Sequence, residues 1–316
     1  MRWLSSKIVR KWIAPRPKNS HKGNFGHVLI VAGSRGMVGA GILSAHGALK
    51  AGAGLVTLAV PRNQQIIAAK HLRPEAMTLG LPETSEGTFS FAAVSLALAH
   101  IKKRRVTSLV IGPGLSKHSE TRDFVKKLLQ KLSPASTLKG VVLDADGFLA
   151  LSGTSFLKKI KIPVIVTPHA GELSRFIGKK ISSSPASRKA QAEKFAKLNQ
   201  VICVLKGHQT LVTTGRTTWV NPTGNPGMAR GGSGDILSGM IAALLMNVRL
   251  PEIALKAACA GVYIHGFAGD LAAKEKTQIA MSAGDIAEKI PTAFKKIKSD
   301  IYNKLSYGPV YLEAKK

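Results

Sequence analysis

The stretch NPTGNPGMARGGSGDILSG, residues 221–239, constrains the fold of this chain more than any other feature. It places five glycines ahead of Asp235 and then becomes apolar at Ile236 and Leu237. Glycine has no Cβ, so its backbone N–H groups can approach an anion closely. The apolar-periodic run DILSGMIAALLMN that follows predicts a helix. The sequence therefore predicts a glycine-rich loop that leads into a helix N-terminus, where free N–H groups and the helix dipole favour a phosphate.

Asp235 stands at this predicted helix N-terminus. A carboxylate beside a phosphate site suits phosphoryl transfer, because it can accept the proton of the attacking hydroxyl. The alternative is a helix N-cap aspartate after a flexible loop. The spacing matches neither the P-loop nor the dinucleotide-binding fingerprint, so other motifs must decide between these two interpretations of Asp235. The anion hole is predicted from Gly231, Gly232, Ser233 and Gly234.

Runs rich in valine, isoleucine and leucine recur as far as residue 220, and helical stretches separate most of them. This alternation is typical of an α/β fold, a mostly parallel sheet with helices on both faces. Beyond residue 234 the pattern is helical throughout. Strands are predicted at 27–33, 55–61, 108–114, 140–147, 163–172 and 200–207, a hairpin around Gly215, and helices at 235–247, 251–273 and 283–298.

No linker, repeat or low-complexity segment divides the chain, so we expect a single domain at residues 21–316. Residues 1–20 are a basic N-terminal segment, in which we expect a short helix stopped by Pro15 and Pro17. The segment has no continuous apolar region, which makes it a poor signal peptide. Two cysteines in apolar contexts, Cys203 and Cys259, predict buried reduced thiols and a cytoplasmic protein.

The composition is strongly basic, with 46 Lys and Arg against 17 Asp and Glu and a net charge of +29. A field of this sign attracts nucleic acids, anionic membranes and phosphorylated metabolites. Aromatic residues make up only 5% of the chain and no nucleic-acid motif is visible, so we expect no specific nucleic-acid partner. No apolar run is long enough to span a bilayer, so we expect no membrane partner either. A proteome that is basic throughout, or an anionic substrate, accounts for the charge better.

Glycine-rich or polar loops follow five of the predicted strands. Ligands of open α/β sheets bind beyond the carboxyl ends of the strands. Five such loops at one edge predict a continuous cleft and favour an enzyme. The loops are AGSRGMVGAG, GPGL, DADG, TPHAGE and KGHQT.

Acidic residues in two of these loops suggest a metal. DADG places Asp144 and Asp146 two residues apart at a strand end, where a strand would put them on one face. With Glu172 of TPHAGE they suit Mg²⁺, bound directly or through water beside phosphates. The alternatives are a turn aspartate and an N-cap in DADG, and a capping box of His169 and Glu172 in TPHAGE.

Two further loops suit nucleotides. Lys206 of KGHQT would carry a positive charge to nucleotide phosphates, and Gly207 would let backbone amides approach them; the alternative is a surface lysine. The glycine-rich region 21–40 would line a pocket for a bulky ligand such as a nicotinamide nucleotide, or only form a helix-start turn.

The chain resembles the ADP/ATP-dependent NAD(P)H-hydrate dehydratase family, of the YjeF C-terminal-domain type. The resemblance covers about residues 21 to 290. It implies a ribokinase-like fold and an enzyme that repairs hydrated NADH or NADPH. ADP or ATP phosphorylates the hydroxyl at C6 of the nicotinamide ring, after which phosphate leaves. The matching stretches, in the family's order, are HKGNFGHVLIVAGSRGMVGA, IGPGL, LDADG, VTPHAGE, VLKGHQT and GNPGMARGGSGDILSG.

The resemblance also implies roles for individual residues. Asp235 would deprotonate the C6 hydroxyl. Two departures from the family pattern, Ala170 for proline and Ser233 for threonine or methionine, remove no chemical group. The implied hydrate-binding positions are Ala40, Gly114, His169 and Asp235, and the implied adenine-nucleotide positions are Lys206, Gly207, His208, Gln209, Thr210 and Gly234.

We expect a separate NAD(P)H-hydrate epimerase as a functional partner, because the 20 residues that precede the match are too few to form that domain. We also expect a homo-oligomer. Two other interpretations stay open. One is a ribokinase-like kinase of a small alcohol or vitamin precursor, which would share Asp235 and the glycines. The other is a non-enzymatic binder of nucleic acids or membrane surfaces, which only the charge suggests.

Overall fold

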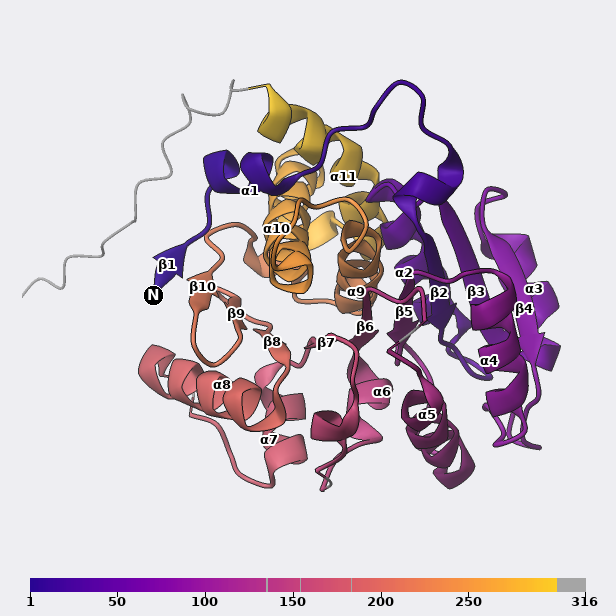
Figure 1. Ribbon diagram of the computed structural model, residues 1–316. Coiled ribbons are helices and arrows are strands. Elements are labelled where there is room, and N and C mark those ends of the chain that lie inside the picture. Colours follow the sequence, from indigo (N-terminus) through magenta and orange to yellow (C-terminus); the bar gives the residue numbers. More distant parts are fainter. Residues whose placement is uncertain (135, 154, 183, 300–316) are drawn as a thin grey trace, which may run out of the picture.

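A ten-stranded sheet runs through the centre of the protein, and helices cover both of its faces (Figure 1). The computed structural model describes residues 1–134, 136–153, 155–182 and 184–299, so the end of the expected 21–316 domain lies outside the described residues. The strand order is β1-β10-β9-β8-β7-β6-β5-β2-β3-β4, and only β9 runs antiparallel to its neighbours. The strands are β1 (Arg2–Trp3), β2 (His27–Val31), β3 (Leu55–Pro61), β4 (Met77–Leu81), β5 (Ser108–Ile111), β6 (Gly140–Leu143), β7 (Val164–Val166), β8 (Ile202–Leu205), β9 (Leu211–Thr213) and β10 (Thr218–Val220).

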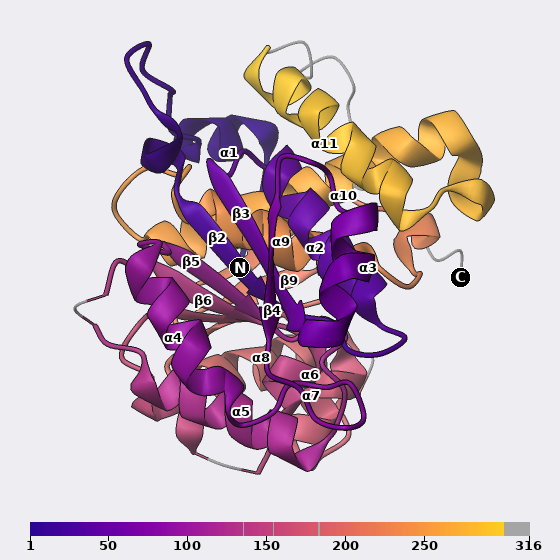
Figure 2. The same ribbon diagram turned by 90° about the vertical axis from the view of Figure 1, so that its right-hand side faces the viewer.

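Each face of the sheet has its own hydrophobic cluster. In β2, Val28 and Ile30 join one cluster while Leu29 and Val31 join the other, as the alternation of a strand requires. Helices α1, α2, α3, α9, α10 and α11 pack on the first face and α4 to α8 on the second (Figure 2). Their bounds are α1 (Ser6–Trp12), α2 (Val38–Lys50), α3 (Gln65–His71), α4 (Ala93–Lys103), α5 (Ser119–Lys131), α6 (Ala145–Leu149), α7 (Ala170–Ile177), α8 (Pro185–Asn199), α9 (Ser233–Leu244), α10 (Ile253–Ala280) and α11 (Ala283–Lys298).

This architecture confirms the predicted α/β class. The six predicted strands correspond to β2, β3, β5, β6, β7 and β8, and β9 and β10 form the hairpin around Gly215. The prediction missed β4, whose sequence MTLGL contains no valine or isoleucine and is only half-buried. It also missed β1, which pairs with β10 at the opposite edge, so the basic N-terminal segment is part of the sheet.

The carboxyl ends of five parallel strands meet at one edge. Strands β8, β7, β6, β5 and β2 are consecutive neighbours in the sheet, and each is the one that a predicted site loop follows. The expected juxtaposition of the five loops is therefore confirmed.

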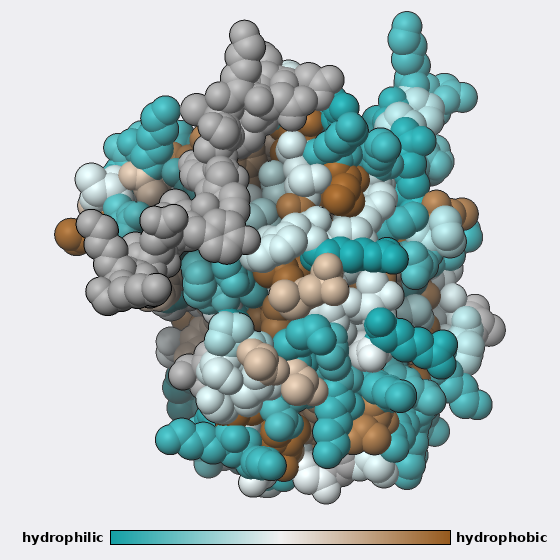
Figure 3. Space-filling view, turned by 90° about the vertical axis from the view of Figure 1, so that its left-hand side faces the viewer, coloured by the Kyte–Doolittle hydropathy of each residue, from teal (hydrophilic) through white to brown (hydrophobic). Residues whose placement is uncertain are grey.

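Hydrophilic side chains are prominent on the face that carries β1 and α8, with smaller apolar patches among them and at the edges of the view (Figure 3). Within the described residues, no helix combines the length and apolarity that crossing a membrane needs. Cys203 and Cys259 are free and buried, as predicted.

Glycines let α9 lie directly against α2. A Cβ at Gly239 would lie 1.8 Å from the carbonyl oxygen of Ser44, and one at Gly47 would lie 2.2 Å from that of Ile236. The buried hydroxyls of Ser44 and Ser238 also meet across the two helices, 3.1 Å apart. Since α9 carries Asp235 in its first turn, this contact fixes where that carboxylate lies.

We expect Gly239→Ala to lower the free energy of unfolding by about 1–3 kcal/mol, because the added methyl group forces two packed backbones apart. Gly39→Ala is the matched control, since a Cβ at that position of α2 meets nothing within 4 Å. Alanine also favours a helix over glycine, so the control should be neutral or up to ~1 kcal/mol more stable. Denaturant unfolding of both variants measures the difference, and equal effects would contradict the close packing.

Candidate active site

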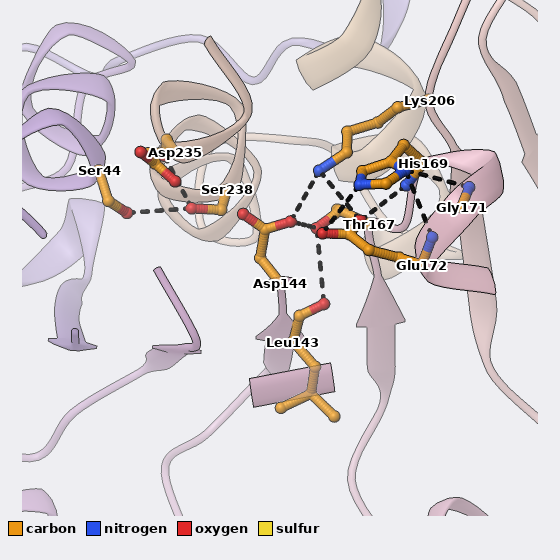
Figure 4. A network of polar contacts seen from close by, with 10 residues as sticks. All are labelled: Ser44, Leu143, Asp144, Thr167, His169, Gly171, Glu172, Lys206, Asp235 and Ser238. Carbon is orange, nitrogen blue, oxygen red and sulfur yellow. Dashed lines mark hydrogen bonds and ion pairs between the residues drawn. The ribbon is translucent and has the colours of Figure 1, made fainter. Parts of the chain in front are cut away.

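A buried ion pair joins the ends of β6 and β8. Asp144 follows β6 with a side chain that is only 1% exposed, and Nζ of Lys206, which follows β8, lies 3.0 Å from its Oδ1. The hydroxyl of Thr167 donates to the same oxygen at 2.6 Å (Figure 4). A buried carboxylate is costly unless it is paired and hydrogen-bonded. Lys206 and Thr167 therefore allow Asp144 to occupy this position.

The ammonium of Lys206 forms ion pairs with two carboxylates. Its Nζ also lies 3.8 Å from Oε2 of Glu172, which is nearly buried. Burial alone would lower the pKa of Lys206, but the carboxylates of Asp144 and Glu172 outweigh it and raise that pKa. Lys206 therefore stays charged at neutral pH and presents a fixed cation at the sheet edge.

Asp235 lies in the first turn of α9, on the other side of Asp144 (Figure 4). Burial, together with the negative charges of Asp144 and Glu172, raises the pKa of Asp235 to about 7, although the charge of Lys206 opposes the rise. A carboxyl that titrates near neutral pH can hold or release a proton at working pH, which suits a general base.

The glycine loop leads into α9 at an N-cap residue that has no capping side chain. The N-cap residue Gly232 is left-handed, with φ 89°, and among the described residues no side chain caps the first turn of the helix. A Cβ at Gly234 would lie 3.1 Å from Nζ of Lys206, so a glycine keeps this turn close to the ammonium. Free amides, the helix dipole and Lys206 together form a site for an anion.

A neutral histidine lies under this turn. Burial lowers the pKa of His265 to about 4, although its hydrogen bond to the backbone of Ser233 favours the charged form. The ring therefore adds no second cation beside Lys206.

Two side chains that the sequence analysis missed hold the glycine loop at its ends. The carboxylate of Asp270 accepts hydrogen bonds from the backbone of Gly224 at 2.9 Å and from the amide of Asn225 at 3.0 Å. Burial raises the pKa of Asp270, although these hydrogen bonds oppose the rise. Arg230 donates to the carbonyls of Gly227, at 2.8 Å, and Ile279, at 3.1 Å. An acid within the apolar run GFAGDLAA was the signal available for Asp270.

His169 and Glu172 form the capping box considered as an alternative. Nδ1 of His169 accepts from the amides of Gly171 at 3.1 Å and Glu172 at 3.3 Å, while Glu172 accepts from the amide of His169 at 2.8 Å. The imidazole side chain stays 53% exposed, so it can still meet a ligand in the cleft. The cap orients the ring and also directs Glu172 toward Lys206.

The three acids predicted as a magnesium site do not converge. Asp146 accepts a hydrogen bond from the amide of Ser116 at 3.1 Å and belongs to α6, which begins directly after Asp144. The expectation that a strand would place both aspartates on one face was therefore wrong. No group of three or more His, Cys, Asp or Glu side chains suited to a metal occurs in the described ranges.

Ala40, in the first turn of α2, and Gly114, in the loop after β5, lie together. A Cβ at Gly114 would lie 3.1 Å from that of Ala40, and the hydroxyl of Ser34 donates to the carbonyl of Gly114 at 2.8 Å. Helix α9 packs against α2, the helix that carries Ala40. Its residue Gly234 lies beside Lys206 of the ion pair. Ala40 and Gly114, two of the implied hydrate-binding positions, thus lie on one side of the helix that carries Asp235, whereas His169 lies beside Lys206, with which it forms a backbone bridge.

Comparisons with known proteins show similarity over most of the chain. A family model described as NAD(P)H-hydrate dehydratase matches residues 28–292. A solved structure of the ADP/ATP-dependent NAD(P)H-hydrate dehydratase from Bacillus subtilis, co-crystallized with ATP and Mg²⁺, is 30% identical with a TM-score of 0.76, covering 94% of this chain and 98% of that one. A ribokinase-like superfamily protein from Enterococcus faecalis gives the same TM-score of 0.76 at 28% identity, covering 94% of this chain and 96% of that one.

Some relatives are longer than this chain. The bifunctional NAD(P)H-hydrate repair enzyme of Moorella thermoacetica is 40% identical over 309 residues, which are 97% of this chain but 56% of the relative. The chain thus spans about half the length of the first curated relatives that it matches.

The raised pKa of Asp235 should appear in the stability of the fold. An unfolded aspartate ionises near pH 4, whereas folded Asp235 keeps its proton until about pH 7. Stability is therefore lost as the pH rises through this window, because the unfolded state releases the proton first. Asp235→Asn cannot ionise and should be more stable than the wild type at pH 8, on the order of 1–4 kcal/mol, with a smaller difference at pH 5.

Denaturant unfolding at the two pH values measures this effect. Asp123→Asn replaces an exposed aspartate on α5 and serves as the control, with changes within about 0.5 kcal/mol at both. A variant of Asp235 that is no more stable than the wild type at pH 8 would contradict a partly buried carboxyl that holds its proton to about pH 7.

Proposed function

The chain belongs to the NAD(P)H-hydrate dehydratase family, and we propose that it uses ADP or ATP to dehydrate hydrated NADH or NADPH. One observation carries the proposal most: Asp235, with its pKa near 7, stands in the first turn of α9 beside Lys206 and the free amides that follow Gly232. A base, a cation and an anion hole at one place are what phosphoryl transfer to a hydroxyl needs. The hydrate offers that hydroxyl at C6.

Asp235 would accept the C6 hydroxyl proton as the oxygen attacks the terminal phosphorus of the nucleotide. The bond from that phosphorus to its bridging oxygen breaks, and the shorter nucleotide leaves. The amides of residues 232–234 and the ammonium of Lys206 stabilise the charge on the transferred group. The C6–O bond of the phosphate ester then breaks, phosphate leaves with the electron pair, and loss of a proton from C5 restores the dihydropyridine.

Residues on both sides of Asp235 would hold the hydrate. Ala40 and Gly114 are small residues in contact range, which leaves room for the nicotinamide ring. His169, with its exposed imidazole, would bind a polar group of the same substrate. The nucleotide would lie toward residues 206–210, and Gly234 would leave room for its phosphates beside Lys206.

Magnesium fits this site as an ion carried by the nucleotide. Asp144 and Glu172 already share Lys206, so they suit water-mediated contact with Mg²⁺ on phosphate oxygens better than direct ligation. Asp146 faces Ser116 and does not belong to this set. The ion would neutralise part of the polyphosphate charge. The related B. subtilis enzyme was co-crystallized with ATP and Mg²⁺.

An epimerase would complete the repair. The relative from M. thermoacetica is named a bifunctional repair enzyme, and this chain aligns with 56% of it. We propose that an NAD(P)H-hydrate epimerase acts with this chain and supplies the epimer that it accepts.

We expect Asp235→Asn to reduce turnover of hydrated NADH by about 10²–10⁴-fold, because the general base is lost. Binding of ADP should change little, since the amide and Lys206 contacts remain. The assay follows the absorbance of reduced nicotinamide with either nucleotide, and Asp123→Asn is the control. Near-wild-type turnover of the Asp235 variant would rule out the base. NMR of the product distinguishes the dehydratase from the alternative kinase, because the kinase would accumulate a stable phosphate ester.

Turnover should also require Mg²⁺ and stop in excess chelator, because the polyphosphate must be partly neutralised. Glu172→Gln should raise the Mg²⁺ concentration for half-maximal rate about tenfold, as losses around a metal site do. Asp146→Asn should leave that concentration unchanged. Full activity in chelator, or an equal effect of both variants, would contradict this assignment.

A further inference from the structure

An arginine from outside every sequence motif reaches the KGHQT loop. Arg188 lies in the first turn of α8, and its guanidinium donates to the carbonyl of His208 at 2.7 Å and to that of Lys206 at 3.5 Å. A Cβ at Gly207 would lie 2.8 Å from the same guanidinium. Gly207 also has φ 141°, so its backbone and the space beside it both favour glycine. The guanidinium thus lies directly behind the peptide of residue 207.

Two further carbonyls of this loop, those of Gly207 and Thr210, also accept hydrogen bonds. The hydroxyl of Thr210 donates to the carbonyl of Gly207 at 3.0 Å, and the amide of Asn221 donates to the carbonyl of Thr210 at 2.9 Å. Within the described part of the chain, no acceptor takes the amide hydrogens of residues 207–209. The loop is therefore held through its oxygens while its N–H groups remain available.

Peptide geometry gives these N–H groups a direction. In a trans peptide the C=O and N–H bonds point to opposite sides. Since Arg188 fixes the carbonyls of Lys206 and His208 on the side of α8, the N–H groups of residues 207 and 209 point away from α8. Helix α8 packs on the sheet face opposite to α9. The two N–H groups therefore point toward the side where α9 and the ammonium of Lys206 lie.

We propose that Arg188 is a positioning residue that turns the N–H groups of Gly207 and Gln209 toward the phosphates of the bound nucleotide. Gln209 has φ 53°, and successive amides around such left-handed residues form concave anion sites. Arginine suits this task because its planar guanidinium can donate to two carbonyls at once. The proposal rests on the proposed function, because the phosphates are those of ADP or ATP.

The test compares the affinities of ADP and adenosine by calorimetry, since only ADP carries phosphates. Arg188→Ala should weaken ADP binding by ~10-fold or more, because hydrogen bonds to charged phosphate are lost, while the affinity for adenosine stays within about twofold. Arg188→Lys keeps the charge but cannot reproduce the planar fork, so it should remain at least ~3-fold weaker than the wild type for ADP. Lys194→Ala removes an exposed cation from the same helix and should bind both as the wild type does.

Several outcomes would overturn the proposal. These are wild-type ADP affinity in Arg188→Ala, full recovery in Arg188→Lys, or an equal loss for adenosine. Thermal unfolding shows whether Arg188→Ala is folded. If it is not, the ADP and adenosine affinities of Arg188→Lys decide the test. If the wild type dehydrates the hydrate with ADP but Arg188→Ala binds ADP equally well, only this inference fails. If the wild type binds neither ADP nor ATP, the proposed function fails too.

Discussion

The ammonium of Lys206 is the charge on which the candidate site depends. It lies 3.0 Å from Asp144 and 3.8 Å from Glu172, and its charge also reaches Asp235. One cation among three carboxylates leaves an excess of negative charge in a partly buried place. That excess, added to burial, keeps the proton on Asp235 until about pH 7. The same imbalance makes the site receptive to Mg²⁺, which a nucleotide would bring.

Close backbone approach places the reacting groups around this charge. Gly239 and Gly47 let α9 touch α2, and Gly234 lets the first turn of α9 lie against Lys206. Asp270 and Arg230 hold the loop that leads to this turn. A base and an anion hole built on one helix move together, which favours a fixed geometry during reaction. The cost is a partly buried carboxylate, that of Asp235, whose ionisation weakens the fold.

The sequence predicted those parts of the site that depend on local chemistry. The glycine loop, the helix after it and the strand ends could be read from spacing, because backbone geometry dictates glycine and strand patterns. The divergence of Asp144 and Asp146 could not, since it depends on a helix that begins at Ala145 with φ 44°. Arg188 and Asp270 were missed because they act from helices distant in sequence. Only packing brings them to the loops.

The pKa of Asp235 tests this account most directly. A ¹³C NMR titration of its carboxyl in the wild type and in Asp144→Asn would measure it. We expect a value near 7 in the wild type and a lower value in the variant, because the carboxylate of Asp144 raises that pKa while Lys206 lowers it. A wild-type value near 4, or a value that Asp144→Asn does not lower, would contradict the central role of the shared charge.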